Sequence, residues 1–163
     1  MMNNLVLRRL RYALSLRETD MVKIFAFADY EIKPGAISDL LKKELEDGYV
    51  ECTDIVLERF LDGFITHKRG VKEGAGPYQP STETVRLNNN IILKKLRIAL
   101  ELHETDMLDI MKKADFTFSK SELSAFFRSR NHRNYKPCGD QMMRNFLMGV
   151  CEKYRPGEDK KAT

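Results

Sequence analysis

The sequence has no long apolar run and few cysteines. No stretch of about 18 or more apolar residues occurs in the 163 residues, which excludes a transmembrane helix. The N-terminal residues lack the basic-then-apolar order of a secretory signal. Three cysteines without a C-x-x-C pair predict neither a disulfide framework nor a metal site. A cytoplasmic protein with reduced thiols and no contact with membranes is the simplest interpretation.

The common catalytic motifs are missing as well. The sequence contains no Gly-rich phosphate loop, no Walker element, no H-E-x-x-H and no G-x-S-x-G. No group of residues combines a nucleophile, a base and an orienting partner at recognisable spacing. We therefore expect a protein that is not an enzyme and that binds no cofactor.

The charge of the chain is concentrated in its second half. The composition, with 42% hydrophobic and 32% charged residues, is that of an ordinary globular protein with a net charge of +4. Residues 1–70 contain 11 Lys and Arg against 12 Asp and Glu, whereas residues 87–155 contain 13 against 8. This asymmetry points to an anionic partner of the second half, although most surface charge serves only solubility.

The chain repeats itself with an offset of 86 positions. Residues 3–14 match residues 89–100, and the register continues without a gap until Arg69 falls on Arg155. About a third of the paired positions are identical. Self-similarity of this kind marks a repeated supersecondary unit, here present as a tandem pair.

Each copy predicts four short helices. Leucines recur at helical spacing in the first helix, and Thr19 and Thr105 suit the N-cap of the second, with Asp20 and Asp106 in its first turn. Pro34 suits the first position of the third helix, where the second copy has a capping box that begins at Ser119. The expected ranges of the first, second and fourth helices are 4–16, 20–28 and 54–68, then 90–102, 106–114 and 140–154.

These features predict an all-α fold made of two tandem, homologous four-helix units. A unit of about 70 residues buries only about 60% of its unfolded surface, so we expect the units to pack on each other as a pseudo-twofold pair. The expected boundaries are a first unit at 1–70, an irregular linker at 71–86, a second unit at 87–157 and a disordered tail at 158–163.

Two arginines recur beside the apolar stripe of the first helix. Arg11 and Arg97 are each flanked by leucines at helical spacing. The favoured interpretation is a structural, partly buried Arg bonded to a carboxylate such as Asp20 or Asp54, or to the equivalent carboxylate of the second copy. An anion-binding role is the alternative.

A Tyr-x-x-Cys-x-Asp element precedes the fourth helix of both copies. Cys52 and Cys138 could be thiols activated at a helix N-terminus, with Asp54 and Asp140 following them. Because no histidine recurs between the copies, small buried sulfurs are the favoured interpretation. A glycine recurs within the fourth helix, at Gly63 and Gly149, which suggests that another helix passes close to it.

The two copies differ most after the third helix. The first copy is acidic there, whereas residues 128–136 of the second copy, the basic loop, mix cations with aromatic residues. This mixture suits phosphate contacts and base stacking, and Phe127 is a further candidate for stacking. A solvated surface loop is the alternative. The candidate nucleic-acid-binding residues are Arg128, Arg130, His132, Arg133, Tyr135 and Lys136.

The repeated motifs also resemble a known family. Residues 88–99, Glu104-Thr105-Asp106 and Cys138-Gly139-Asp140-Gln141 are similar to the YehS-like family of small bacterial proteins, as are Asp54-Ile55-Val56-Leu57 and Phe60-Leu61-Asp62-Gly63. The resemblance covers roughly residues 3–155 and includes the duplication. The family is a domain of unknown function, so it implies a bacterial, cytoplasmic origin and supplies no catalytic residues.

Three functional hypotheses remain. The first is a non-enzymatic binding or regulatory protein whose basic second unit contacts nucleic acid. The second is an adaptor for another protein, with an apolar groove between the repeats as its binding surface. The third, an enzyme that uses Cys52 or Cys138, has the least support in the sequence.

Overall fold

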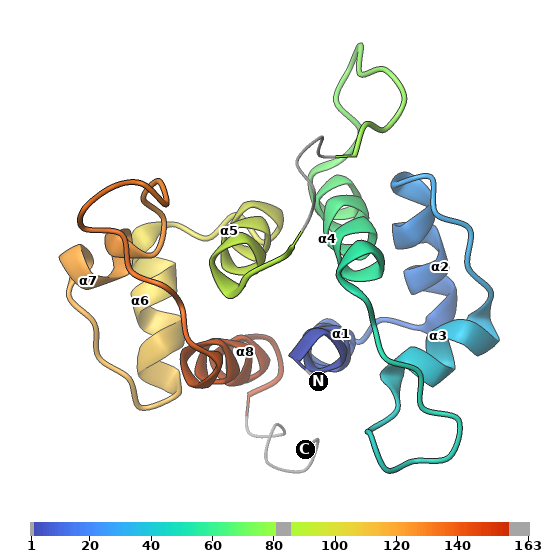
Figure 1. Cartoon of the computed structure of the whole chain (residues 1–163), viewed down its shortest axis with the longest axis horizontal. Helices are drawn as coiled ribbons and strands as arrows, with labels where there is room; N and C mark the ends of the chain where they lie inside the picture. The colour runs from blue at the N-terminus through green and yellow to red at the C-terminus, as the bar shows by residue number, and fades with distance from the viewer. Residues whose placement is uncertain (1, 81–85, 157–163) are drawn as a thin grey trace.

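Eight helices form the regular structure of residues 2–80 and 86–156, which are the residues that the computed structural model describes (Figure 1). No strand occurs in these residues. The expected all-α fold with two four-helix units is confirmed. The helices are α1 (Met2–Ala13), α2 (Glu18–Phe27), α3 (Pro34–Leu41), α4 (Asp54–Arg69), α5 (Asn89–Ala99), α6 (Glu104–Lys113), α7 (Lys120–Ala125) and α8 (Asp140–Tyr154).

The second and fourth helices of each unit cross at a glycine. A Cβ atom added to Gly63 would clash with the carbonyl oxygen of Ile24 in α2. The same addition to Gly149 would clash with the carbonyl oxygen of Ile110 in α6. The backbone of α4 therefore lies directly against that of α2, and the backbone of α8 lies directly against that of α6.

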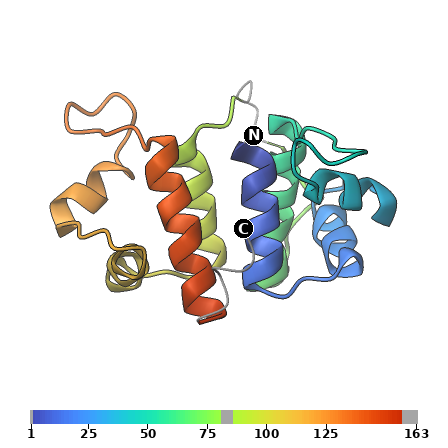
Figure 2. The same ribbon diagram turned by 90° about the horizontal axis from the view of Figure 1, so that it is seen from below.

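The two units are joined through their first and last helices. α1 contacts α8, and α4 contacts α5, so these four helices run side by side at the centre while α2, α3, α6 and α7 lie outside (Figures 1 and 2). Arg155 Nη1 donates to the carbonyl oxygen of Tyr12 over 3.3 Å, and Arg69 Nη1 donates to that of Ile98 over 3.2 Å. These contacts join equivalent positions in opposite directions, as a pseudo-twofold axis requires.

The hydrophobic core continues from one unit into the other. Phe25, Phe60 and Phe64 are fully buried in the first unit, where the Phe25 and Phe60 ring centroids are 5.4 Å apart. Phe146 and Met143 are fully buried in the second unit. The buried apolar residues of all the helices form a single cluster, so each unit completes the other's core.

The second helix of each unit starts earlier than the sequence predicted. Thr19, the expected N-cap, lies inside the first turn, and the N-cap is Arg17. Asp20 Oδ2 accepts a hydrogen bond of 2.8 Å from the Arg17 backbone N–H, so the helix is capped by a carboxylate in its first turn. The second unit repeats this correction, with Thr105 inside the helix, His103 at the N-cap and Asp106 as the acceptor over 2.8 Å.

The first helix of each unit ends earlier than predicted. α1 stops at Ala13 and α5 stops at Ala99. Ser15 and Glu101, two residues further on, have φ angles of 52° and 53°, in the left-handed region. A residue in the left-handed conformation ends a helix. Glycine is the residue that usually indicates such an end in a sequence, and neither Ser nor Glu does so.

The third and fourth helices begin where the sequence predicted. Pro34 occupies the first turn of α3. In α7 the Ser119 hydroxyl accepts from Glu122 N over 3.0 Å, while the Glu122 carboxylate accepts from Ser119 N over 3.1 Å. α4 and α8 begin at Asp54 and Asp140.

The linker is irregular where the structure describes it. Residues 70–80 and 86–88 form neither helix nor strand. Tyr78 donates a hydrogen bond of 2.6 Å to Asp62 Oδ2 in α4, and the same carboxylate pairs with Lys95 of α5. Burial, followed by the bond to Asp62, raises the pKa of the Tyr78 phenol. Residues 81–85 and the tail expected at 158–163 lie outside the described residues.

None of the described helices combines the length and the apolar character that crossing a bilayer requires.

Candidate nucleic-acid interface

A buried asparagine holds the loop of the first unit against the start of α1. The Asn4 amide donates to the carbonyl oxygens of Leu40 and Val50, both over 2.9 Å. Its Oδ1 accepts from the backbone N–H of Cys52 over 2.9 Å. Asn4 is fully buried, so its three bonds satisfy backbone groups that water cannot reach.

The second unit contains the same network. Asn90 Nδ2 donates to the carbonyl oxygens of Phe126 and Lys136 over 3.0 and 2.9 Å, and its Oδ1 accepts from Cys138 N over 2.8 Å. The preceding residue, Asn89, donates to the carbonyl oxygen of Cys138 over 3.0 Å and to Asp140 over 2.8 Å. Both ends of the basic loop are thereby fixed to the first turn of α5.

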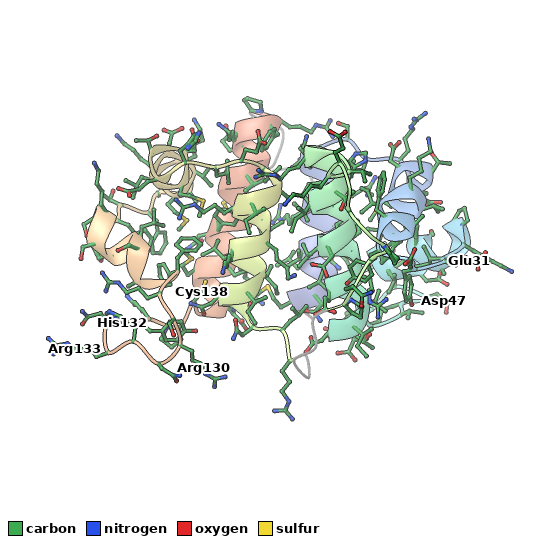
Figure 3. The ribbon with its side chains drawn as sticks, turned by 90° about the horizontal axis from the view of Figure 1, so that it is seen from above. Glu31, Asp47, Arg130, His132, Arg133 and Cys138 are labelled. Atoms are coloured by element: carbon green, nitrogen blue, oxygen red, sulfur yellow. The ribbon has the colours of Figure 1, made fainter. Side chains whose placement is uncertain are left out.

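The basic loop joins α7 to α8 and projects from the outer end of the second unit. Figure 3 shows Arg130, His132 and Arg133 on it, with Glu31 and Asp47 at the opposite end of the molecule. Backbone bonds stabilise the loop, including His132 N to the Ser129 carbonyl oxygen over 2.8 Å. The side chains of these three basic-loop residues are exposed.

A cavity of about 810 Å³ lies between the basic loop and α5. Aromatic rings line it, and so do the amides of Asn88 and Asn90. Among the described residues that line it there is no carboxylate. A smaller hollow of about 410 Å³ shares Arg130 and Tyr135 with it and reaches Asp140. The cations that line the larger cavity are Arg86, Lys94, Arg128 and Arg130.

Among the described residues, no carboxylate forms an ion pair with a cation of the cavity. Arg128 donates to the carbonyl oxygen of Asn134 over 3.2 Å and to the Ser124 hydroxyl over 3.3 Å, which positions it without cancelling its charge. Within the described part of the chain, Lys94 and Arg130 form no hydrogen bond or ion pair. Several positive charges around one concave surface attract anions.

The equivalent place in the first unit is occupied by internal bonds. Tyr49 donates to Asn4 Oδ1 over 3.1 Å, and Arg8 donates to the carbonyl oxygen of Lys42 over 3.1 Å. Lys42 itself pairs with Asp39 over 2.9 Å. The matching positions thus bond to one another, and the Lys42 charge is neutralised by a carboxylate, whereas no carboxylate pairs with Arg128 in the described residues.

Tyr135 and Lys94 are the second-unit equivalents of Tyr49 and Arg8, but they do not form the equivalent internal bonds within the described residues. Within the described residues Tyr135 forms no hydrogen bond to Asn90, and both side chains line the cavity. The tyrosine at this position is therefore bonded to the buried asparagine in the first unit, whereas in the second unit it lines the cavity.

Two other aromatic rings of the cavity are held in place by cations. The Arg97 guanidinium lies 4.6 Å from the centroid of the Phe127 ring, and Lys136 Nζ lies 5.8 Å from that of Phe126. Phe126 is almost wholly buried, whereas Phe127 is half-buried. Both contacts favour the observed orientations of the rings.

The carboxylate partners predicted for the repeated arginines are wrong. Arg97 Nε donates to the carbonyl oxygen of Leu102 over 3.1 Å, and its charge lies against Phe127. Arg11 is exposed. The expected partner Asp20 caps α2 instead. The spacing placed each arginine beside a leucine stripe, but it could not show which neighbours the other helices bring.

Only part of the predicted binding set surrounds the cavity. Arg128, Arg130 and Tyr135 line it, together with Phe127, whereas His132, Arg133 and Lys136 lie elsewhere on the basic loop. His132 Nδ1 accepts from Asn134 N over 3.0 Å and so helps to shape the loop. Sequence reasoning missed Arg86 and Lys94. The recurring asparagine at the start of each repeat was the one sequence feature that could have indicated them. Asn90 bonds to both sides of the basic loop and so brings the segment with Arg86 and Lys94 next to it.

The two repeated cysteines are poor nucleophiles. Cys52 and Cys138 are buried, and their thiols donate to the neighbouring carbonyl oxygens over 3.6 and 3.7 Å. The pKa of each thiol is raised to about 12, first by burial and then by the negative charge of Asp54 or Asp140. The thiolate required for nucleophilic attack is therefore suppressed at neutral pH. Elsewhere in the described residues, no cluster of His, Cys, Asp and Glu suits a metal ion.

Duplication, helix order and the paired asparagine networks define a class of protein with two copies of one helical unit. The chain belongs to the family described as Protein of unknown function (DUF1456), which matches residues 3–70 and again residues 89–156. It is 43% identical over 150 residues to the uncharacterized protein YehS of Escherichia coli (strain K12), with 92% of this chain and 94% of that protein covered. No solved structure matches the chain.

Proposed function

We propose that the protein is a non-enzymatic, cytoplasmic binding protein that contacts nucleic acid through its second unit. The cavity between α5 and the basic loop supports this proposal, because four cations and no carboxylate are found among the described residues that line it. Three buried, free cysteines support the cytoplasmic location.

Phosphate is the anion that best suits this surface. Arginine forms paired hydrogen bonds with phosphate oxygens, and three of the four cavity cations are arginines. Exposed Arg133 and Lys136 extend the positive surface along the basic loop beyond the cavity. A phosphate backbone, with charges at regular intervals, can meet both parts at once.

Charge reversal between the repeats supports the assignment to the second unit alone. Residues 42–50, which correspond to the basic loop, carry Glu44, Glu46 and Asp47. Their counterparts in the basic loop are Arg130, His132 and Arg133. A scaffold that only folds has no need to invert the charge of one loop while it keeps the surrounding asparagine network.

The alternative of a protein adaptor with an apolar groove between the repeats has less support. α1 lies against α8 and α4 lies against α5, so the facing helices cover each other. Cys151 of α8 is buried and donates to the carbonyl oxygen of Arg9 over 3.7 Å. Nucleic acid is therefore the better supported partner.

The test is fluorescence anisotropy of labelled DNA and RNA oligomers, titrated with the protein at low and at physiological salt. Contact with about four phosphates predicts that log K falls against log salt with a slope of about −3 on a single strand. The triple variant Arg128→Ser, Arg130→Ser, Arg133→Ser should lose this binding.

A second triple variant controls for net charge. Lys23→Ser, Lys33→Ser, Lys72→Ser removes the same number of charges from exposed positions outside the cavity and should bind as the original protein does. An equal loss of affinity in both triple variants would show that binding depends only on the net charge of the protein, and would count against a site on the basic loop. Unchanged binding by the first triple variant, or no binding at low salt, would overturn the proposal.

A further inference from the structure

We infer that the cavity of the second unit receives one unpaired nucleotide, so that the protein prefers single-stranded nucleic acid to a duplex. The inference rests on the proposed function and names its substrate class. In this arrangement the cations hold the phosphate, and the base lies against the aromatic lining.

The site is concave and large enough for a small ligand. The cavity has a volume of about 810 Å³, within the range of about 300–1,000 Å³ in which small ligands bind. A groove that only follows a duplex backbone needs no such hollow. A base inside a duplex is stacked on both faces, so only an unpaired or extruded base reaches a concave site.

The lining of the cavity places aromatic rings beside cations. Phe127 and Tyr135 line the cavity together with Arg128 and Arg130. The Arg97 guanidinium lies over the Phe127 ring, 4.6 Å from its centroid, and so favours the observed orientation of the ring. An inorganic anion would gain nothing from these rings, whereas a nucleotide uses the charge and the rings together.

The equivalent tyrosines of the two repeats differ in their hydrogen bonds. Tyr49 is bonded to Asn4 Oδ1 over 3.1 Å and so cannot turn its ring toward a ligand without breaking that bond. Tyr135 has no such bond to Asn90 within the described residues, and it is half-buried at the edge of the cavity. The ring at this position is therefore available for stacking in the second unit only.

The experiment compares one sequence as a single strand and as a blunt duplex, with binding followed by anisotropy. Tyr135→Leu removes the ring and should weaken single-strand binding by about five- to 150-fold, the range for loss of one stacked base. Tyr135→Phe keeps the ring and should bind within about twofold of the original protein. Tyr49→Leu, at the equivalent position of the first unit, is the matched control and should have no effect on binding.

A stacked base gives a second readout. An oligomer with a single 2-aminopurine should lose fluorescence on binding to the original protein and to Tyr135→Phe, because stacking on a ring quenches this base. The loss should be absent with Tyr135→Leu at saturating concentration. Far-UV circular dichroism of each variant verifies the helical fold independently of binding.

Each opposite result has a distinct meaning. Equal affinity for duplex and single strand, with no effect of Tyr135→Leu, would overturn the inference and leave the proposed function intact. Binding of a mononucleotide without any oligomer would overturn both and assign the cavity to free nucleotides. A low-salt dimer that dissociates when Glu44, Glu46 and Asp47 are changed to Lys, again without oligomer binding, would overturn both and assign the cavity to the acidic loop of a second copy.

Discussion

At the scale of single residues, one buried asparagine in each unit holds a distant loop against the first helix of that unit. Asn4 and Asn90 each join two carbonyl oxygens and one N–H of a loop that is distant in sequence. Each asparagine is almost wholly buried. Loss of its side chain would leave three buried backbone groups without a hydrogen-bond partner. A buried unsatisfied group costs about 1–3 kcal/mol.

Asn90→Leu should therefore lower the free energy of unfolding by at least about 3 kcal/mol. The apolar side chain fills the space but bonds to none of the three groups. Urea denaturation followed by circular dichroism measures the change. Asn88→Ala is the control: Asn88 caps α5 by accepting from Ile91 N over 2.9 Å, so its loss should cost about 1 kcal/mol. Similar losses in the two variants would contradict the special role of Asn90.

At the scale of helices, the crossings at Gly63 and Gly149 fix the distance between the second and fourth helices. Gly63→Ala should destabilise the protein by about 2 kcal/mol or more, because the added methyl meets backbone and no side chain can move aside. The gain in helix propensity, about 1 kcal/mol, does not offset this. Gly35→Ala in α3 meets nothing within 4 Å and should be neutral or stabilising. Thermal unfolding of both variants measures these changes in stability. A Gly63→Ala variant more stable than the original protein would contradict the close approach of α2 and α4.

Helix boundaries show how far local sequence reaches. The starts of α3, α4, α7 and α8 were predictable because Pro34, the Ser119 capping box and the two aspartates act within one turn. The start of α2 was not predictable, because Thr19 and Asp20 both suit a cap and only the observed backbone shows that the carboxylate is used. The repeat itself required no structure to recognise.

The candidate site was only partly within reach of the sequence. The basic loop is continuous in sequence, so Arg128, Arg130 and Tyr135 could be named from composition. Arg86 and Lys94 could not, because they meet the loop only after Asn90 has bound both of its ends. The partners of Arg97 are also brought by folding, since Phe127 and Leu102 lie on segments that its helical spacing does not specify.

At the scale of the whole molecule, the pseudo-twofold arrangement separates structure from charge. Both units keep the same helices, crossings and asparagine networks. The equivalent loops nevertheless carry opposite charge, and the labelled acidic and basic residues lie at opposite ends (Figure 3). Duplication thus provides a first unit that completes the core and a second unit whose surface is free to vary.

Because of this pseudo-twofold axis, the two units should be able to follow each other in either order along the chain. The axis carries the gap between the end of α4 and the start of α5 onto the gap between the end of α8 and the start of α1. A copy of residues 70–87 placed between Arg155 and Met2 should therefore span that second gap. A circular permutant that begins at Asn88 and ends at Gly70 should keep the helical content of the original chain and unfold within about 1 kcal/mol of it. Circular dichroism and urea titration measure both. A permutant without cooperative unfolding would show that the order of the units matters to folding, whereas a stable one would show that the protein behaves as a ring in which either junction can be opened.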